Sequence, residues 1–200
     1  MADFVLKGHI CYSESKNELI TRENAYVVCV GGKSKGVFTE LPQQYAVLPL
    51  KDYSDCLIVP GMIDLHIHAP QYAFRGMCMD LELMDWLNCY TFPEEAKYMA
   101  LEYAERAYAI FVNALKASAT TRAVVFATRH RPATELLMKL MEESGLASYV
   151  GKVNMDREAA EVLVEESAAV SASETVQWIE AVKEKYTNTK PILTPRFIPC

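Results

Sequence analysis

The fold of this chain is decided by the stretch Pro60-Gly61-Met62-Ile63-Asp64-Leu65-His66-Ile67-His68, which closes an apolar run at residues 56–59. Side chains alternate between the two faces of a β-strand, so the pattern predicts a strand with Asp64, His66 and His68 on one face and apolar residues on the other. Two imidazoles spaced i, i+2 suit a borderline-soft divalent cation such as zinc. The stretch therefore predicts a strand that ends in a pair of metal ligands.

Charge and hydropathy argue against two classes of partner. The 200 residues carry a formal net charge of −6 and no basic cluster, which argues against a protein that binds nucleic acid by neutralising phosphates. No apolar run approaches the roughly 18 to 20 residues of a membrane span, and the N-terminus has no apolar signal-peptide core. We expect neither a nucleic acid nor a membrane as a partner.

The cysteines indicate a reducing compartment. None of the six shows a paired spacing such as Cys-x-x-Cys, so they read as reduced, mostly buried thiols of a cytoplasmic protein. A zinc site built from cysteines is not expected. The six are Cys11, Cys29, Cys56, Cys78, Cys89 and Cys200.

Residues 1–59 are predicted to form a small β domain. Runs rich in β-branched and aromatic residues at 4–10 and 25–30 read as strands, and the glycine-rich segment 31–36 supplies turn chemistry. Short strands at this spacing favour a small sheet or part of a β-sandwich. Pro60-Gly61 is the best candidate for a boundary, which gives domains at 1–59 and 60–200.

Beyond this boundary the pattern changes to alternating strands and helices. After the strand that ends at His68, further strands are predicted at residues 120–128, 149–153 and 192–197. Strands separated by helices pair in parallel through right-handed crossovers. The second domain is therefore predicted to be an α/β fold with a parallel sheet.

Three helices are predicted between these strands, from capping residues and from apolar residues at helical spacing. The first is expected to begin at Thr91, which has capping-box spacing to a glutamate three residues later. The second should run from Pro132 to Gly145, because proline suits a first helical turn and glycine ends a helix. The third is expected to begin at Ser171, which has the same capping-box spacing.

Two architectures fit four strands and three helices. A complete (β/α)8 barrel takes about 250 residues, which is well above the number of residues that follow the boundary at Pro60-Gly61. The segment is therefore either a small open α/β sheet or the first half of a TIM-type barrel. A resemblance to a known family favours the half-barrel.

Blocks of sequence spread over residues 59–197 carry that resemblance. Residues 59–68 resemble the first barrel strand of the metal-dependent amidohydrolases. The continuation Ala69-Pro70-Gln71-Tyr72 is similar to guanine deaminases, as are the blocks at 90–94, 126–130, 150–156 and 190–197, in the order and spacing of that family. The resemblance implies four βα units of a barrel, preceded by part of a composite β-sandwich domain.

The resemblance also implies an activity and its residues. It implies zinc-dependent hydrolytic deamination of guanine to xanthine and ammonia, a step of purine catabolism, by an enzyme that is typically a homodimer. His66 and His68 match metal ligands, and Arg196 with Phe197 matches the pair that recognises guanine. A planar guanidinium can donate two hydrogen bonds to O6 and N7 of guanine, and a phenyl ring can cover a purine face. The substrate-contacting positions are His68, Ala69, Pro70, Gln71, Arg196 and Phe197.

The chain also departs from the family. The remaining metal ligands and the glutamate that shuttles protons would lie beyond Cys200, so no catalytic residue is expected within the chain and it reads as an incomplete or inactive fragment. Ala119 stands where the family has glycine. If that position has positive φ, alanine there should cost roughly 1 kcal/mol. Two alternatives stay open: a non-catalytic, partner-binding relative, or an amidohydrolase acting on another heterocyclic amine.

Other polar residues of the sequence have simpler structural explanations. Asp64 is expected to be a polar residue at a strand end or to orient a metal ligand, and His130 is expected to pack or to line a pocket. Three glutamates, Glu161, Glu165 and Glu166, are expected on a solvated face. No functional role follows from the sequence for Arg75, Arg129 and Arg131.

Overall fold

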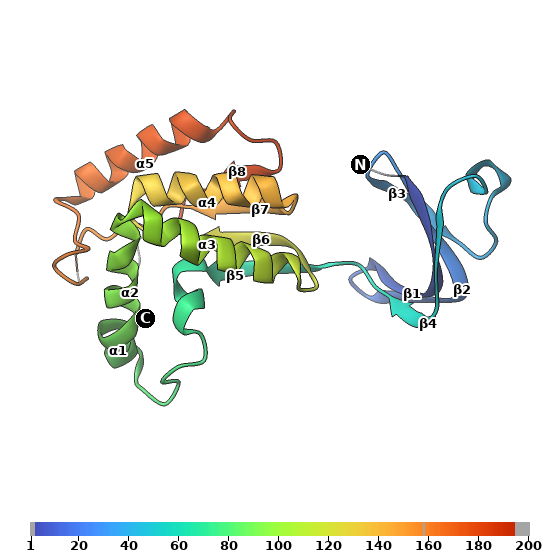
Figure 1. Ribbon diagram of the computed structural model, residues 1–200, viewed down its shortest axis with the longest axis horizontal. Helices are drawn as coiled ribbons and strands as arrows, with labels where there is room; N and C mark the ends of the chain where they lie inside the picture. The colour runs from blue at the N-terminus through green and yellow to red at the C-terminus, as the bar shows by residue number, and fades with distance from the viewer. Residues whose placement is uncertain (1–2, 158, 195–200) are drawn as a thin grey trace. The chain divides into compact units, whose positions relative to one another are not determined.

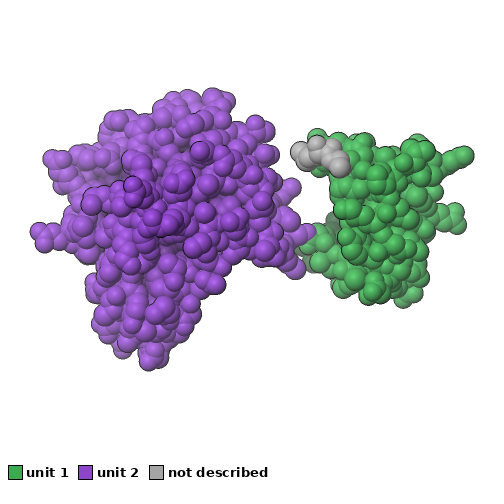
Figure 2. Space-filling model, viewed as in Figure 1, with its two compact units in different colours: residues 1–60 green, residues 61–200 purple. Residues whose placement is uncertain are grey.

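The chain divides into two compact units. A computed structural model describes residues 3–157 and 159–194. The units comprise Met1–Pro60 and Gly61–Cys200, and Figure 2 shows them in separate colours. Each unit has its own sheet.

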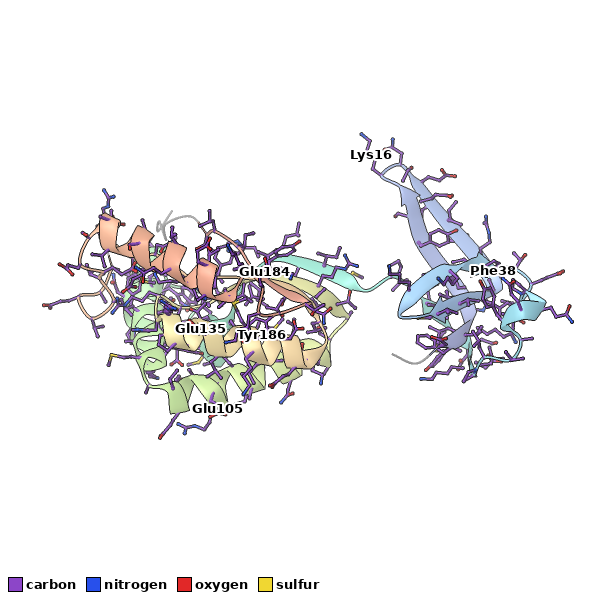
Figure 3. The ribbon with its side chains drawn as sticks, turned by 90° about the horizontal axis from the view of Figure 1, so that it is seen from above. Lys16, Phe38, Glu105, Glu135, Glu184 and Tyr186 are labelled. Carbon is purple, nitrogen blue, oxygen red and sulfur yellow. The ribbon has the colours of Figure 1, made fainter. Side chains whose placement is uncertain are left out.

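The first unit is built on a single four-stranded sheet. Its strands are β1 (Phe4–Ser15), β2 (Glu18–Val30), β3 (Lys33–Phe38) and β4 (Leu50–Ile58), in the order β3-β2-β1-β4. The β1–β2 hairpin is antiparallel, with Lys16 in the turn at its tip (Figure 3), whereas β4 pairs with β1 in parallel. Apolar side chains, among them Val5 and Val28, are buried in its core. The prediction of β structure before residue 59 is confirmed.

The second unit contains a parallel sheet. Its strands are β5 (Met62–His68), β6 (Thr120–Phe126), β7 (Ala147–Gly151) and β8 (Thr189–Pro191), in the order β5-β6-β7-β8. All three neighbouring pairs are parallel. The expected α/β class and parallel pairing are therefore confirmed.

Three long helices pack on one face of this sheet, as Figure 1 shows. They are α3 (Leu101–Lys116), α4 (Arg131–Ser144) and α5 (Ala168–Val182). Val125 of β6 and Val150 of β7 are fully buried in one cluster with Phe111, Leu137 and Trp178 from the three helices. Glu105 of α3 points away from the sheet (Figure 3). This division of apolar and charged faces holds the helices to the sheet.

A helical segment joins β5 to α3. It comprises a 3-10 helix (Ala69–Phe74), α1 (Leu83–Trp86), a π-helical turn (Leu87–Thr91), α2 (Phe92–Ala96) and a second 3-10 turn (Lys97–Met99). Figure 1 shows α1 and α2 beyond the carboxyl ends of the strands. A second apolar cluster lies there, which we call the mouth cluster: Leu87, Phe92, Val153, Met155 and Leu163.

The structure corrects two of the three predicted helix starts. Thr91 has helical φ and ψ and its side chain makes no capping hydrogen bond, so the predicted cap is wrong, and α3 begins only after Ala100. The third helix begins earlier than predicted, because the Ser167 hydroxyl accepts from the Val170 N–H. The middle helix ends as predicted, with Gly145 in the left-handed conformation at φ 79°.

Two further expectations need correction. The fourth strand of the parallel sheet is Thr189–Pro191, so residues 192–194 follow the strand instead of forming it, and 195–197 lie outside the described residues. Among the described residues, the only non-glycine residues with positive φ are Asn24 and Cys78. Ala119 therefore carries no left-handed strain, and its carbonyl accepts from the Met62 N–H at 2.8 Å.

No helix in the described part of the chain is both long enough and apolar enough to cross a membrane.

Candidate metal centre

The two histidines of β5 converge at the carboxyl end of the strand. Nε2 of His66 lies 3.1 Å from Nε2 of His68. Two nitrogens bound to one tetrahedral zinc, each at 2.0 to 2.1 Å from the metal, would lie about 3.3 Å apart. The donor type and the separation therefore fit a metal held between the two rings, and the role of the pair as metal ligands stays a prediction. The contact is a hydrogen bond in which one ring nitrogen donates to the other.

A slip in strand register shapes this end of β5. Asp64 pairs with Ala123 and Ile67 with Val125, so β5 has one more residue than β6 over the same interval. Such a bulge interrupts the strict alternation of side chains. Asp64 is therefore in register with a residue buried beneath the helices, and the prediction that it shares a face with both histidines is wrong. Its carboxylate accepts from the His66 N–H at 3.0 Å.

His68 lies in an apolar setting. Its ring stacks on Phe126 of β6, with centroids 4.8 Å apart and an interplanar angle of 15°. His66 also contacts that ring, at 4.5 Å and 43°. Burial, reinforced by the neighbouring His66, lowers the pKa of His68 to about 4. The His68 imidazole is thus neutral near pH 7, which is the form that binds a metal.

The predicted substrate loop follows the histidines directly. Ala69 and Pro70 are buried, and Gln71 is partly exposed in the same 3-10 helix. Arg75, for which the sequence suggested no role, places its guanidinium 3.8 Å from the ring centroid of Tyr72 and donates to the Tyr72 carbonyl at 3.0 Å. This contact ties the end of the 3-10 helix to its own middle.

The other predicted substrate residues, Arg196 and Phe197, lie outside the described residues. The chain leading to them is fixed to the end of β7. The Ile192 N–H donates to the Val150 carbonyl at 2.9 Å, and the Thr194 hydroxyl donates to the Lys152 carbonyl. A Cβ on Gly151 would meet Cγ2 of Thr194 at 2.0 Å, so the approach requires glycine at that position.

A buried ion pair lies close to this segment, and the sequence analysis missed it. Nζ of Lys152 donates to Oε1 of Glu165 at 2.7 Å, and the side chains of both residues are almost completely buried. Burial alone would raise the pKa of Glu165, but hydrogen bonds from Lys152, the Met155 N–H and Ser171 hold that pKa below its usual value. The expectation that Glu165 lies on a solvated face is wrong.

The ion pair belongs to a wider network. Oδ1 of Asn154 accepts from Thr175 at 2.7 Å and from Lys152 at 3.3 Å, and it lies 3.0 Å from the Ser171 hydroxyl that donates to Glu165. The network ties the β7–α5 loop to α5. The sequence did contain a signal for the ion pair, because Lys152 directly follows a buried strand and a buried ammonium needs a partner. The partner could not be identified, because Glu165 is thirteen residues away in a segment without periodicity.

A second buried carboxyl lies over the end of β6. Glu95 of α2 is buried, and burial raises its pKa to about 8. Hydrogen bonds from the Thr128 side chain and the Arg129 backbone act in the opposite direction and lower this pKa. His130 precedes α4, with its Nε2 buried, and burial lowers its pKa to about 4. Its partial burial agrees with the expected packing role. Arg131 pairs with Glu135 at 2.9 Å, one turn further along α4.

Within residues 3–157 and 159–194, no group of three or more histidine, cysteine, aspartate or glutamate side chains is placed to hold a metal. The described residues therefore offer two candidate ligands on β5, which would not by themselves complete a zinc site. A structural zinc has four ligands and a catalytic zinc has three protein ligands with one open position.

The sequence matches a known family of proteins. Residues 57–197 match the model of the amidohydrolase family, and the chain belongs to that family. Within it, the chain is similar to guanine deaminases. It is 40% identical to guanine deaminase of Rattus norvegicus over 140 residues, which cover 70% of this chain and 31% of the rat protein. The corresponding values for guanine deaminase of Escherichia coli are 37% over 153 residues, 75% and 34%.

A solved structure of a guanine deaminase is also similar to this chain. A crystal structure of guanine deaminase from C. acetobutylicum, with guanine bound in its active site, superposes on 98% of this chain with a TM-score of 0.91 and 39% sequence identity. The match covers 47% of that protein. The chain thus spans about a third of the length of the curated relatives, and about half of the solved one.

Proposed function

We propose that this chain contributes the first half of a (β/α)8 barrel, and two zinc ligands, to an enzyme that hydrolyses guanine to xanthine and ammonia. The observation that carries the proposal is the 3.1 Å approach of the two imidazole nitrogens of His66 and His68 at the carboxyl end of β5. Active sites of (β/α)8 enzymes lie at that end of the barrel strands. The similarity to guanine deaminases supports the choice of substrate.

The half-barrel part of the proposal is supported by strand order. Four parallel strands follow one another in sequence, with the intervening long helices on one face, and a barrel closes with eight such strands. We propose domains at 1–59 and 60–200, with the first as part of a composite β-sandwich.

The chemistry assigned to the chain is binding and orientation. A zinc ion held by His66 and His68 would supply Lewis-acid activation of water. The His68 ring is neutral near pH 7 and offers its lone pair, while Phe126, which packs against the mouth cluster, stacks on the ring. No residue of this chain is assigned to proton transfer.

Substrate recognition is assigned to Gln71, Arg196 and Phe197, together with the residues that begin at His68. The proposed purine contacts include the Gln71 amide, which can both donate and accept, and the Arg196 guanidinium, which can donate to O6 and N7 of guanine. Phe197 would cover one face of the base. The backbone of His68, Ala69 and Pro70 would form the adjoining wall.

Three wider parts of the proposal rest on the family resemblance and on thiol chemistry. We place the complete enzyme in purine catabolism, as a homodimer in the cytoplasm. The five cysteines of the described residues are free thiols, which agrees with a reducing compartment. None of these five is buried, so the prediction that most of the cysteines are buried is wrong.

A chimera tests the proposed function. Residues 1–200 of this chain would replace the matching part of the C. acetobutylicum guanine deaminase, and release of xanthine and ammonia would be measured. We expect turnover of guanine, its loss in His66→Ala and His68→Ala chimeras, and a large loss of selectivity for guanine in Arg196→Ala. The 200-residue chain alone should release no ammonia.

Two outcomes would overturn the proposal. A folded, zinc-loaded chimera that deaminates cytosine or a triazine but not guanine would assign another heterocyclic amine. A folded, zinc-loaded chimera without any turnover would assign a non-catalytic role to this segment.

A further inference from the structure

We propose that Phe126 is a positioning residue for the two histidines: its ring fixes the orientation in which both imidazole nitrogens face one metal. The inference rests on the proposed function, because it assumes that His66 and His68 bind zinc. It adds a residue for which sequence reasoning suggested no role.

The phenyl ring of Phe126 contacts the imidazoles of both His66 and His68. Phe126 pairs in register with His68 across the parallel β5–β6 ladder, so both side chains leave the sheet on the same side. Its ring centroid lies 4.8 Å from that of His68, with the two planes nearly parallel at 15°, and 4.5 Å from that of His66, with the planes tilted by 43°. One phenyl ring thus contacts both imidazoles, whose Nε2 atoms lie 3.1 Å apart.

Phe126 is itself held in place. It packs against the mouth cluster of Leu87, Phe92, Val153, Met155 and Leu163. On the side of β7 its partner in register is Gly151, which has no side chain to compete for the space. Phe126 is therefore backed by the mouth cluster, and its contact with the histidines is part of a packed layer.

The stack restricts a soft torsion. Rotation of an imidazole about χ2 has broad, roughly two-fold minima, so a histidine on a strand end can turn its Nε2 away at little cost. A flat aromatic surface against the ring removes that freedom, and aromatic pairs of this kind contribute beyond their buried area. A branched aliphatic side chain would fill the volume but offer no flat surface. Preorganised ligands bind a metal more tightly than ligands that must be ordered on binding.

The test is a titration of the 200-residue chain with Zn²⁺, in which NMR spectra report the ring nitrogen signals of His66 and His68. Against the unsubstituted chain, Phe126→Leu should weaken zinc binding about 2- to 10-fold. Phe126→Tyr keeps the aromatic face and should bind within about twofold of the unsubstituted chain. Phe38→Leu is the matched control, because it removes an aromatic ring in the first unit, and it should leave zinc binding unchanged.

A direct contact measurement covers the case in which Phe126→Leu fails to fold. Cross-relaxation between ring protons of Phe126 and His68 should be visible in the unsubstituted chain without zinc, and its absence would overturn the inference. Equal zinc affinity in a folded Phe126→Leu variant would overturn the positioning role alone and leave the metal assignment standing. Histidine signals that do not respond to zinc in the unsubstituted chain would overturn the metal assignment, and with it this inference.

Discussion

Nζ of Lys152 lies 2.7 Å from Oε1 of Glu165, and both side chains are shielded from solvent. Removing one partner of a buried ion pair leaves an uncompensated charge, whereas replacing both with apolar groups is often neutral or stabilising. We predict that Lys152→Met destabilises the fold by about 3 to 5 kcal/mol, and that Lys152→Met with Glu165→Leu recovers most of the loss. Urea denaturation, followed by spectroscopic signals from the second unit, measures the stability of both variants.

The matched control for the buried pair is Lys139→Met. Lys139 and Glu143 are 3.9 Å apart on the exposed face of α4. Exposed pairs of this kind contribute little, so the urea midpoint should not move. A Lys152→Met variant with the same midpoint as Lys139→Met would show that the pair at Glu165 is not buried in solution.

The second prediction concerns pH dependence. Burial raises the pKa of Glu95 to about 8, whereas an unfolded glutamate titrates near 4.3. The protonated carboxyl therefore stabilises the folded state fully below about pH 4.3, and this contribution is lost as pH rises through about 8. We predict that stability falls with pH between 6.5 and 8, by at most about 1.4 kcal/mol per unit.

That pH window isolates Glu95. The lowered pKa values of His68 and His130, both about 4, make stability rise with pH only up to about 6.5, the pKa of an unfolded histidine. Glu95→Gln should flatten the profile between pH 6.5 and 8, whereas the neighbouring Glu94→Gln should leave the slope in place. An unchanged slope in Glu95→Gln would contradict the account of this carboxyl.

The third prediction tests the approach of residues 192–194 to β7. A Cβ on Gly151 would lie 2.0 Å from Cγ2 of Thr194, so Gly151→Ala should displace this segment and lower the thermal midpoint. Adding Thr194→Ser removes the clashing methyl group but keeps the hydroxyl that donates to the Lys152 carbonyl. The double variant should regain part of the midpoint, and amide hydrogen exchange at residues 192–194 would localise the change. If the serine gives no recovery, the clash is not with that methyl group.

The elements that the sequence predicted well are those with strong local signals. Alternation of residue types gave β5, and proline at the start with glycine at the end gave α4, with Gly145 in the expected conformation. The approach of the two histidines could be predicted for the same reason, because both imidazoles lie two residues apart on one strand.

The remaining features depend on residues far away in sequence. The register slip between Asp64 and Ile67 arises from pairing with β6, which no pattern within β5 reveals. Thr91 has capping-box spacing, but the chain continues through a π-helical turn into α2, so the cap never forms. Lys152 and Glu165 are joined by tertiary contacts of an aperiodic loop.

The most direct test of the central claim is a comparison of zinc binding in four single variants of this chain, one for each of its four histidines. Calorimetric titration with Zn²⁺ should give one weak site in the unsubstituted chain, which is lost in both His66→Ala and His68→Ala and retained in His9→Ala and His130→Ala. Retention of the site in His66→Ala or His68→Ala, or its loss in His9→Ala or His130→Ala, would contradict the assignment of the β5 pair as the metal ligands.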